Sequence, residues 1–410
     1  MSFQQGLSGL NAAARNLSVI GNNVANANTV GFKESRTEFS DVYANTVLGT
    51  TKNAVGLGTK VATVSRMFSQ GGITTTDNPF DVAISGNGFF RMNNNGSILY
   101  SRNGQFHRDN EGYLVNADGY KLTGYQASKT GEIVPIEPVP LLLQSTSLEA
   151  RSTGEVRQGA ILDSREPAIV EADHPFDPSN SETYTHATSV SVFDSLGNSH
   201  LLSTYYVKRD AGTWDTYVLL NGDVANRQGP FALNFDTSGV LEASSDSRLD
   251  LTFPASMLDT GAADMNIAYD LVSTTQTGRA FSNEMQYQDG YTSGMLSSFS
   301  IDEYGMLVAN FSNEMTRVIG QIALVQFVNP QGLSAVGGNN FVETASSGTP
   351  RVGTAGSSDF GVLMAGALED SNVDLTEALV NMITAQRVYQ SVAQSIKTED
   401  SVMQTLVNLR

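Results

Sequence analysis

Hydrophobic residues near both ends of the chain recur at alternating steps of four and three, the spacing of a helix that packs along one seam. The N-terminal series is Phe3, Leu7, Leu10, Ala14, Leu17 and Val24, interrupted at Gly21. The C-terminal series is Leu375, Leu379, Met382, Tyr389, Ala393, Ile396, Met403 and Val407, widened by Val392 and Leu406. The pattern predicts an amphipathic helix at each end, and the two seams could pair with each other.

Local signals set the expected ends of these two helices. Residues 26–29 (Asn-Ala-Asn-Thr) should end the first helix, because asparagine favours turns over helix interiors. Asp374, followed three residues later by Glu377, has the pattern of a capping box at the start of the second. No Gly or Pro occurs from Val373 to Arg410. A helix of that extent would be roughly 55 Å long.

Residues 72–363 have a different pattern, in which short β-branched or aromatic segments are separated by Gly, Asn and Asp. A D-x-x-G-x-L unit begins at Asp109, Asp236 and Asp302, and a weaker copy begins at Asp194. Aspartate at the first position and glycine at a position of positive φ are typical of a short hairpin loop. The interior of the chain is therefore predicted to be all β.

A pair of terminal helices would still leave apolar side chains on its flanks. Val19, Ile20, Ile383 and Val402 lie outside the two seams. A helix with such flanks is marginal in water unless something covers them. Two interpretations remain open from the residues alone: a helical hairpin within one monomer, or packing against further copies of the chain, which gives filaments when head-to-tail contacts do not close.

Charge is unevenly distributed along the chain. The 24 basic and 42 acidic residues give a formal net charge of −18. Residues 145–284 hold 20 acidic and 8 basic residues, or −12 of this total, so we expect that stretch to be the most exposed to solvent. Nucleic-acid binding is not expected, because contacts to phosphate need clustered Lys and Arg.

Composition also limits cofactors and targeting. The chain has no cysteine, which excludes disulfides, zinc–thiolate sites and cysteine nucleophiles. No apolar run approaches the ~20 residues of a membrane span, so membrane insertion is not expected. The N-terminus lacks the basic and apolar regions of a cleaved signal peptide.

The residues indicate no active site. The phosphate-binding, serine-hydrolase and zinc-protease motifs are absent from the sequence. The densest polar cluster is Glu171, Asp173, His174 and Asp177, but its prolines favour a solvated loop over a metal site. Trp214, the single tryptophan, is expected in the core. We therefore predict no catalytic residue, no metal and no cofactor.

Several long segments resemble the bacterial flagellar rod and hook proteins. Residues 6–33 read GLSGLNAAARNLSVIGNNVANANTVGFK, and residues 81–90 read DVAISGNGFF. Residues 100–106 (YSRNGQF), 366–375 (GALEDSNVDL) and 382–389 (MITAQRVY) continue the match. Within this family, the acidic insert of about 140 residues favours a hook subunit over the shorter rod subunits.

The resemblance implies a fold that is mainly β and multi-domain, with the N- and C-terminal helices pairing as a coiled coil and with nested domains built from discontinuous segments. The implied parts are a terminal coiled-coil domain at 1–28 and 371–410, a connector at 29–71 and 364–370, an inner β domain at 72–144 and 285–363, and an outer acidic β domain at 145–284.

The resemblance also implies roles in assembly. Residues expected to pack within and between subunits are Leu7, Leu10, Leu17, Val24, Leu375, Leu379, Met382, Tyr389, Ile396 and Met403. Residues expected to form the turn from helix to connector are Asn22, Asn23, Asn26, Asn28, Gly31 and Phe32. A plain helix stop at Asn22 and Asn23 is compatible with this role.

The function implied by the resemblance is mechanical. The chain would polymerise with itself into a curved hollow tube, the flagellar hook, which acts as a universal joint between rod and filament. It would leave the cell by the flagellar type III export apparatus, without a cleaved signal peptide, and contact rod, hook-cap and hook–filament junction proteins. The alternatives are a distal rod or hook-associated protein and, remotely, a secreted β-rich enzyme or adhesin.

Overall fold

The computed structural model of the chain describes residues 3–42, 56–128, 131–143 and 147–408. It divides the chain into two compact units. Unit 1 comprises Met1–Ser145, Ser298–Asn310 and Thr316–Arg410, and unit 2 comprises Thr146–Ser297 and Phe311–Met315. The four-part division expected from the resemblance remains a prediction.

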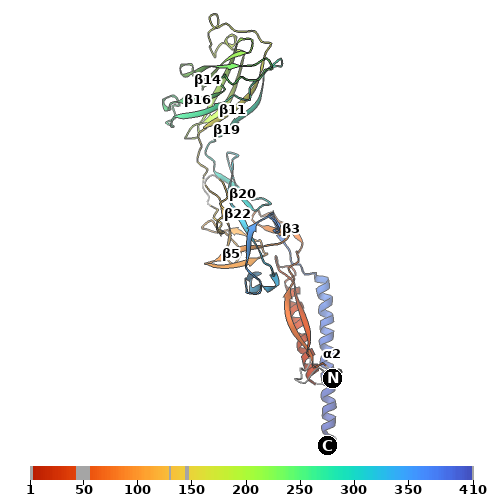
Figure 1. The fold of residues 1–410 in the computed structure, drawn as a ribbon. Helices are drawn as coiled ribbons and strands as arrows, with labels where there is room; N and C mark the ends of the chain where they lie inside the picture. The colour runs from red at the N-terminus through yellow and green to blue at the C-terminus, as the bar shows by residue number, and fades with distance from the viewer. Residues whose placement is uncertain (1–2, 43–55, 129–130, 144–146, 409–410) are drawn as a thin grey trace. The chain divides into compact units, whose positions relative to one another are not determined.

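Unit 1 contains both long helices, which lie side by side (Figure 1). Helix α1 spans Phe3–Ala25 and helix α2 spans Leu375–Asn408, so the predicted helices are confirmed. Helix α2 begins after Asp374, whose carboxylate accepts hydrogen bonds from the backbone N–H groups of Thr376 at 2.8 Å and Glu377 at 3.1 Å. Within the described parts of the chain, no helix is both long and apolar enough to cross a membrane.

A β-hairpin follows the first helix, inside the range expected as a connector. Strands β1 (Ser35–Val42) and β2 (Gly58–Arg66) pair antiparallel, with a shift of register between Glu38 and Phe39. Both strands contact α1, and Figure 1 shows the hairpin running along the helices. The hairpin covers one side of α1 that would otherwise face water.

The β part of unit 1 is built from one large sheet and several short pairs. Its central strand order is β20-β21-β22-β9-β5-β6-β24-β23. The strands are β3 Ile73–Thr75, β4 Val82–Ser85, β5 Phe89–Asn94, β6 Ser97–Ser101, β7 His107–Arg108, β8 Leu114–Val115, β9 Lys121–Gln126, β10 Val139–Pro140, β20 Leu296–Ile301, β21 Met306–Phe311, β22 Thr316–Gln326, β23 Ser334–Gly337, β24 Asn340–Val342, β25 Arg351–Thr354, β26 Val362–Ala365 and β27 Ala367–Glu369.

Strand β22 shows why this sheet holds two hydrophobic clusters. Successive side chains of a strand point to opposite faces. Ile322 and Leu324 therefore join one cluster, whereas Val325 joins another with Phe89 and Phe341. The apolar run of β22 lacks the alternation of a half-exposed strand because both of its faces are buried.

Unit 2 is formed by two sheets around a common core. One has the order β12-β13-β14-β15, and the other has β16-β17-β11-β18 with β19 paired to β11. The strands are β11 Glu155–Asp163, β12 His186–Phe193, β13 Ser199–Asp210, β14 Thr213–Leu220, β15 Gln228–Asn234, β16 Arg248–Phe253, β17 Met265–Asp270, β18 Thr275–Thr277 and β19 Ser282–Gln288. Alternate side chains of β16 and β17 are buried. Trp214 is fully buried, which confirms its expected place in the core.

The predicted D-x-x-G loops form the same turn at every copy. The glycine N–H donates to the aspartate carbonyl at Gly112, Gly197, Gly239 and Gly305, with φ between +77° and +93°. The aspartate carboxylate also accepts a backbone N–H just beyond the glycine in each copy. Asn116 forms an equivalent turn with Gly119. These loops are thus explained by turn geometry.

Asp194, in the turn between β12 and β13, gives unit 2 an expected pH dependence. Its carboxylate is fully buried and accepts hydrogen bonds from Asn198, His200 and Thr260. Burial by itself raises the pKa of Asp194, but these hydrogen bonds outweigh it and the pKa is lowered. Since the folded-state pKa lies below the unfolded value, its stabilising contribution is present above about pH 4 and is lost as the pH falls further.

We therefore expect Asp194→Asn to lower the stability of unit 2 more at about pH 7 than at about pH 3. Urea unfolding followed by the fluorescence of Trp214 measures this, because the single tryptophan lies in unit 2. Equal losses at both pH values would show that the charge of this carboxylate does not stabilise the fold.

Candidate assembly interface

The two terminal helices pack through small residues. The buried positions of α1 include Gly6, Ala12 and Ala13, and those of α2 include Ala378 and Ala385. A Cβ atom at Gly6 would lie 2.9 Å from Cγ1 of Ile396, so only glycine fits this approach without a shift. The contact within one chain therefore includes a stripe of small side chains in addition to members of the predicted seam such as Ile396.

The predicted seam lies beside this contact and is incompletely covered. Half-buried members are Leu10, Leu17, Val24, Met382 and Ile396. Exposed members are Phe3, Leu7, Leu375, Leu379, Tyr389 and Met403, with exposed fractions of 37–60%. The side chains of Leu406 and Val407 lie outside the described residues. The structure thus brings half of the seam together within one chain and leaves the other half at the surface.

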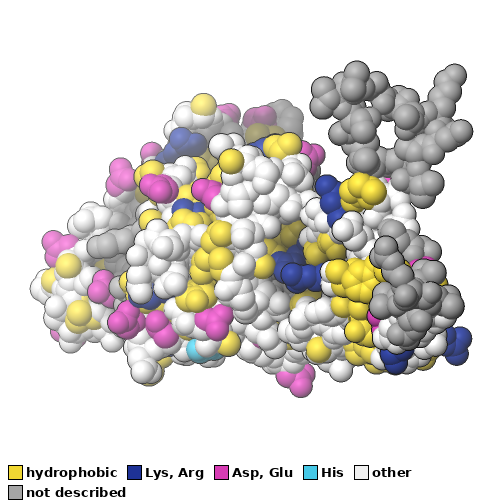
Figure 2. Space-filling view, turned by 90° about the horizontal axis from the view of Figure 1, so that it is seen from below, with side chains coloured by type: hydrophobic (Ala, Val, Ile, Leu, Met, Phe, Trp, Pro, Cys, Tyr) yellow, Lys and Arg dark blue, Asp and Glu magenta, His cyan; other side chains and the backbone are white. Residues whose placement is uncertain are grey.

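Helix α2 also exposes apolar residues away from the seam. Val380 is 58% exposed and Ile383 is 52% exposed, and Val388 and Val402 are similar. Figure 2 shows hydrophobic side chains at the surface between mostly uncharged ones. A helix that carries apolar side chains on more than one face needs burial on more than one side. In a single chain this burial is incomplete.

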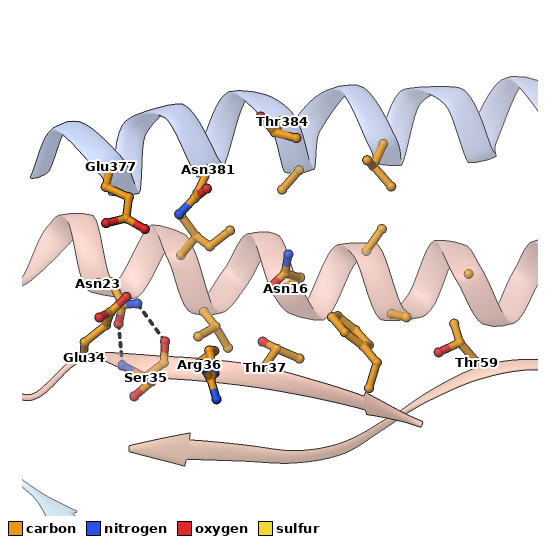
Figure 3. Close-up of a pocket in the computed structure, with 18 of the residues that line it drawn as sticks. Asn16, Asn23, Glu34, Ser35, Arg36, Thr37, Thr59, Glu377, Asn381 and Thr384 are labelled. Atoms are coloured by element: carbon orange, nitrogen blue, oxygen red, sulfur yellow. Dashed lines mark hydrogen bonds between the residues drawn. The ribbon is translucent and has the colours of Figure 1, made fainter. Parts of the chain in front are cut away.

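A groove runs between α1, α2 and the hairpin (Figure 3). Its volume is about 640 Å³. Its apolar lining includes Val19 and Ile20 of α1 and Val388 and Val392 of α2. Glu34 and Glu377 lie together at one end. Val19 and Ile20, predicted as uncovered flanks, are half-buried along this groove.

The predicted turn after α1 is held by side-chain amides. Asn23 is buried, and its amide both donates to the carbonyl of Ser35 at 2.8 Å and accepts from its N–H at 3.0 Å. Asn26 donates to the carbonyl of Asn22 at 2.9 Å. Asn28 is exposed and Phe32 is buried. Asn23 therefore connects the helix end to β1, and Asn26 forms a hydrogen bond within the turn.

Gly31 provides the left-handed backbone of this turn, with φ of +68°. None of the four asparagines, all of which the structure describes, has a positive φ. Asn23 and Asn26 therefore contribute to this turn through side-chain hydrogen bonds rather than through a left-handed backbone. A Cβ atom at Gly31 would lie 2.6 Å from the backbone nitrogen of Asn103, so glycine is required there by both backbone and space.

Three buried charges join this turn to the start of α2. The carboxylate of Glu369 contacts Nζ of Lys33 at 2.6 Å and Nε of Arg102 at 2.8 Å. The side chains of Lys33 and Glu369 are fully buried. Arg102 also donates to the carbonyls of Gly86 and Gly88. We call these three residues the charged junction.

The charged junction links segments that are far apart in sequence. Lys33 follows α1, Arg102 follows β6 and Glu369 ends β27 just before α2. Burial lowers the pKa of Lys33, and the carboxylate of Glu369 opposes this effect. Asn372 adds a further link by accepting from the N–H of Glu34 and donating to the carbonyl of Met67. The junction therefore fixes where the two helices leave the β part of unit 1.

Sequence reasoning missed the charged junction, although its three residues lie in the segments that carry the family resemblance. The local sequence gives little signal, because Lys33 is followed directly by Glu34 and Glu369 is followed directly by Asp370. A buried lysine needs a carboxylate partner, but the sequence does not indicate which of 42 acidic residues provides it. Among the described residues, no group of three His, Asp or Glu side chains is placed to hold a metal ion.

Two glycines of α1 allow a matched test of the helix contact. We expect Gly21→Ala to stabilise unit 1 by about 0.5–1 kcal/mol, because alanine favours the helix and its Cβ would meet no atom within 4 Å. Gly6→Ala should give no gain, since its Cβ would crowd Ile396. Thermal unfolding followed by circular dichroism compares them; equal gains would contradict the close helix contact.

Comparison with known proteins gives matches at both ends and in the middle of the chain. The matching family models are "Flagella basal body rod protein" at residues 3–33, "Flagellar hook protein FlgE/F/G D1 domain" at 83–158, "Flagellar basal body protein FlaE D2 domain" at 161–291 and "Flagellar basal body rod FlgEFG protein C-terminal" at 364–409.

Individual relatives match over their full length. The chain is 43% identical over 416 residues to flagellar hook protein FlgE of Salmonella typhimurium and 41% identical over 415 residues to that of Escherichia coli K12, covering 100% of both chains in each case. It is 34% identical to the hook protein of Borreliella burgdorferi. The fold is similar to that of Helicobacter pylori FlgE2, with a TM-score of 0.55 and 15% identity over 71% of this chain and 98% of that one.

Proposed function

The chain belongs to the flagellar hook protein FlgE family, and we propose that it builds the hook by packing the uncovered sides of α1 and α2 against those of neighbouring copies. The observation that carries this proposal is the exposure of large apolar side chains along α2. Burying an apolar side chain stabilises an interface by about 1.5–3 kcal/mol. The predicted seam residues would then be covered in the polymer, although one chain leaves half of them at the surface.

A tube joined in this way would transmit torque. Packed helices resist twisting about the tube axis because their side chains interlock. Bending requires other contacts between copies to be small and polar, so that they slide at little cost. The acidic surface of unit 2 suits contacts of that kind. The tube would then act as the flexible joint between the rod and the filament.

Unit 2 is accordingly expected to set the shape of the hook rather than its formation. Asp250 is exposed on β16. We predict that Asp250→Lys changes the curvature or bending stiffness of the hook while polymers still form, as electron microscopy of isolated hooks would measure. Leu375→Asp, on α2, is expected to prevent polymerisation. If changes in unit 2 prevent polymerisation as readily, this division of roles between the two units is wrong.

The remaining partners follow from this role. A hook subunit meets the rod at one end of the tube and the hook cap, and later the junction proteins, at the other. We propose that it is exported unfolded through the flagellar type III apparatus without removal of an N-terminal signal. Helices that are stable only when packed suit this passage, because they need not be unfolded against a large barrier.

Immunogold electron microscopy tests the proposed location. An antibody raised against unit 2 is applied to whole cells and to extracted basal bodies, with a strain lacking this gene as the control. Gold along the short curved segment between rod and filament is the expected result. Gold confined to the rod, or absent from the flagellum, would overturn the proposal.

A further inference from the structure

We propose that the groove between α1, α2 and the hairpin receives a different face of α2 from a second copy, with the partner copy's Arg387 held between Glu34 and Glu377. This inference rests on the proposed function and adds which surface of one copy meets which surface of the next. It is carried by the shape of the groove, by its charge and by the position of Arg387.

The groove has the form of a helix-binding site. Its lining comes from three separate elements and includes small residues of α1, namely Gly9, Ala12 and Ala13. Small lining residues leave room for the side chains of a further helix. The apolar walls, with Val19, Val388 and Phe39, suit the aliphatic side chains of an amphipathic helix. A volume of about 640 Å³ holds several such side chains.

One end of the groove carries two carboxylates that form no ion pair among the described residues. They belong to Glu34 and Glu377, which lie there together (Figure 3). Their neighbour Arg36 pairs instead with Glu38 at 3.8 Å. Burial, and then the charge of Glu377, raise the pKa of Glu34, partly offset by Arg36. Two neighbouring carboxylates, of which Glu34 is half-buried and Glu377 is exposed, favour the arrival of a cation.

The complementary surface lies on α2 itself. Val380, Ile383 and Arg387 follow the i, i+3, i+7 spacing of a helix that enters a groove. All three are exposed, and Arg387 has no ion-pair partner within the described residues. They do not line the groove of their own chain, whereas Glu377, Thr384 and Val388 of the same helix do. One helix thus carries both a wall of the groove and the face that fits it.

This arrangement accounts for an open polymer. The groove and the stripe are different patches of one chain, and a contact between one patch on a copy and the other patch on the next copy can be head-to-tail. In a head-to-tail contact, each copy presents a free groove at one side and a free apolar stripe at the other. A contact of this type adds copies without limit unless the rotation closes a ring.

A charge exchange in the full-length protein tests the proposal. Glu377→Arg and Arg387→Glu are made singly and together, and polymer is measured by sedimentation and electron microscopy. Each single change should raise the protein concentration needed for polymerisation at least about tenfold, because like charges then face each other across the contact. The double variant should return to within about threefold of the original chain.

Matched variants separate this contact from general effects of charge. Glu377→Arg combined with Lys397→Glu has the same composition of charges but should not be restored, because Lys397 lies on another part of α2. Circular dichroism of the monomers checks that α2 is intact. If Glu377→Arg loses helix, Glu34→Arg takes its place in the same exchange.

The outcomes also distinguish this inference from the proposed function. Restoration only by the exchange with Arg387 supports the groove contact. If the double variant stays defective although its helices are intact and the original chain polymerises, the groove contact is overturned and the proposed function stands. If the original chain itself forms no polymer, both are overturned.

Discussion

Replacing Glu369 by glutamine is expected to lower the free energy of unfolding of unit 1 by about 3–5 kcal/mol. Glutamine keeps the size of the side chain but removes the negative charge between Lys33 and Arg102, which contact it at 2.6 Å and 2.8 Å. Two buried cations then face each other without a counter-charge. Removing one partner of a buried ion pair lowers the free energy of unfolding more than replacing the whole pair by apolar residues does.

The two units provide an internal control for this measurement. Urea unfolding is followed in one sample by far-ultraviolet circular dichroism, which reports the helices of unit 1, and by the fluorescence of Trp214 in unit 2. The helix transition should move to lower urea while the tryptophan transition stays in place. Glu111→Gln, which removes the partner of an exposed pair with Lys121, should change neither.

A second variant tests the reason for the loss. The charged junction holds two cations and one carboxylate, so Lys33→Met leaves Arg102 and Glu369 as a balanced pair. The loss should be smaller than for Glu369→Gln and should come mainly from the hydrogen bond of Lys33 to the carbonyl of Ser69. If both variants lose the same free energy of unfolding, the charge argument is contradicted, and the loss would be explained by packing alone.

Replacing Ile383 by aspartate is expected to raise the concentration needed for polymerisation by about 100-fold or more. The side chain of Ile383 is 52% exposed in the single chain, so the fold of the monomer does not depend on this side chain. In the polymer, an aspartate would be buried at an apolar contact without a partner. The helix content of the monomer should be unchanged. Its free energy of unfolding should stay within about 0.5 kcal/mol of that of the original chain.

Leu196→Asp is the matched control, because Leu196 is a large apolar residue of unit 2 with 57% exposure. It adds the same charge to the chain without touching the helices. Polymerisation by this variant should be close to that of the original. If Leu196→Asp blocks polymerisation and Ile383→Asp does not, copies join through unit 2, and the proposed function of the helices is wrong.

The sequence was sufficient for features that depend on local chemistry. The spacing of apolar residues predicted both helices, since Phe3–Ala25 and Leu375–Asn408 hold the two seams. The aspartate–glycine loops were predicted for the same reason: the carboxylate bonds its own backbone, and glycine supplies the positive φ at Gly112 and Gly305. Neither feature needs a distant partner.

Features that join distant segments could not be predicted. Lys33 and Glu369 are 336 positions apart, and nothing local identifies them as partners. The small buried residues of the two helices, such as Gly6 and Ala385, were also not predicted, because they carry little hydrophobic signal. The predicted assembly residues and domain boundaries stay predictions until contacts between copies are measured.

Cysteine reactivity in monomer and polymer tests the central claim most directly, because the chain has no cysteine of its own. Val380→Cys and Leu196→Cys place single thiols at sites of 58% and 57% exposure, in α2 and in unit 2. Both should react with a maleimide in the monomer. In the polymer, the thiol at position 380 should become at least about tenfold slower, as contacts cover α2, while the thiol at position 196 stays reactive. A reactive position 380 with a protected position 196 would contradict assembly through the terminal helices.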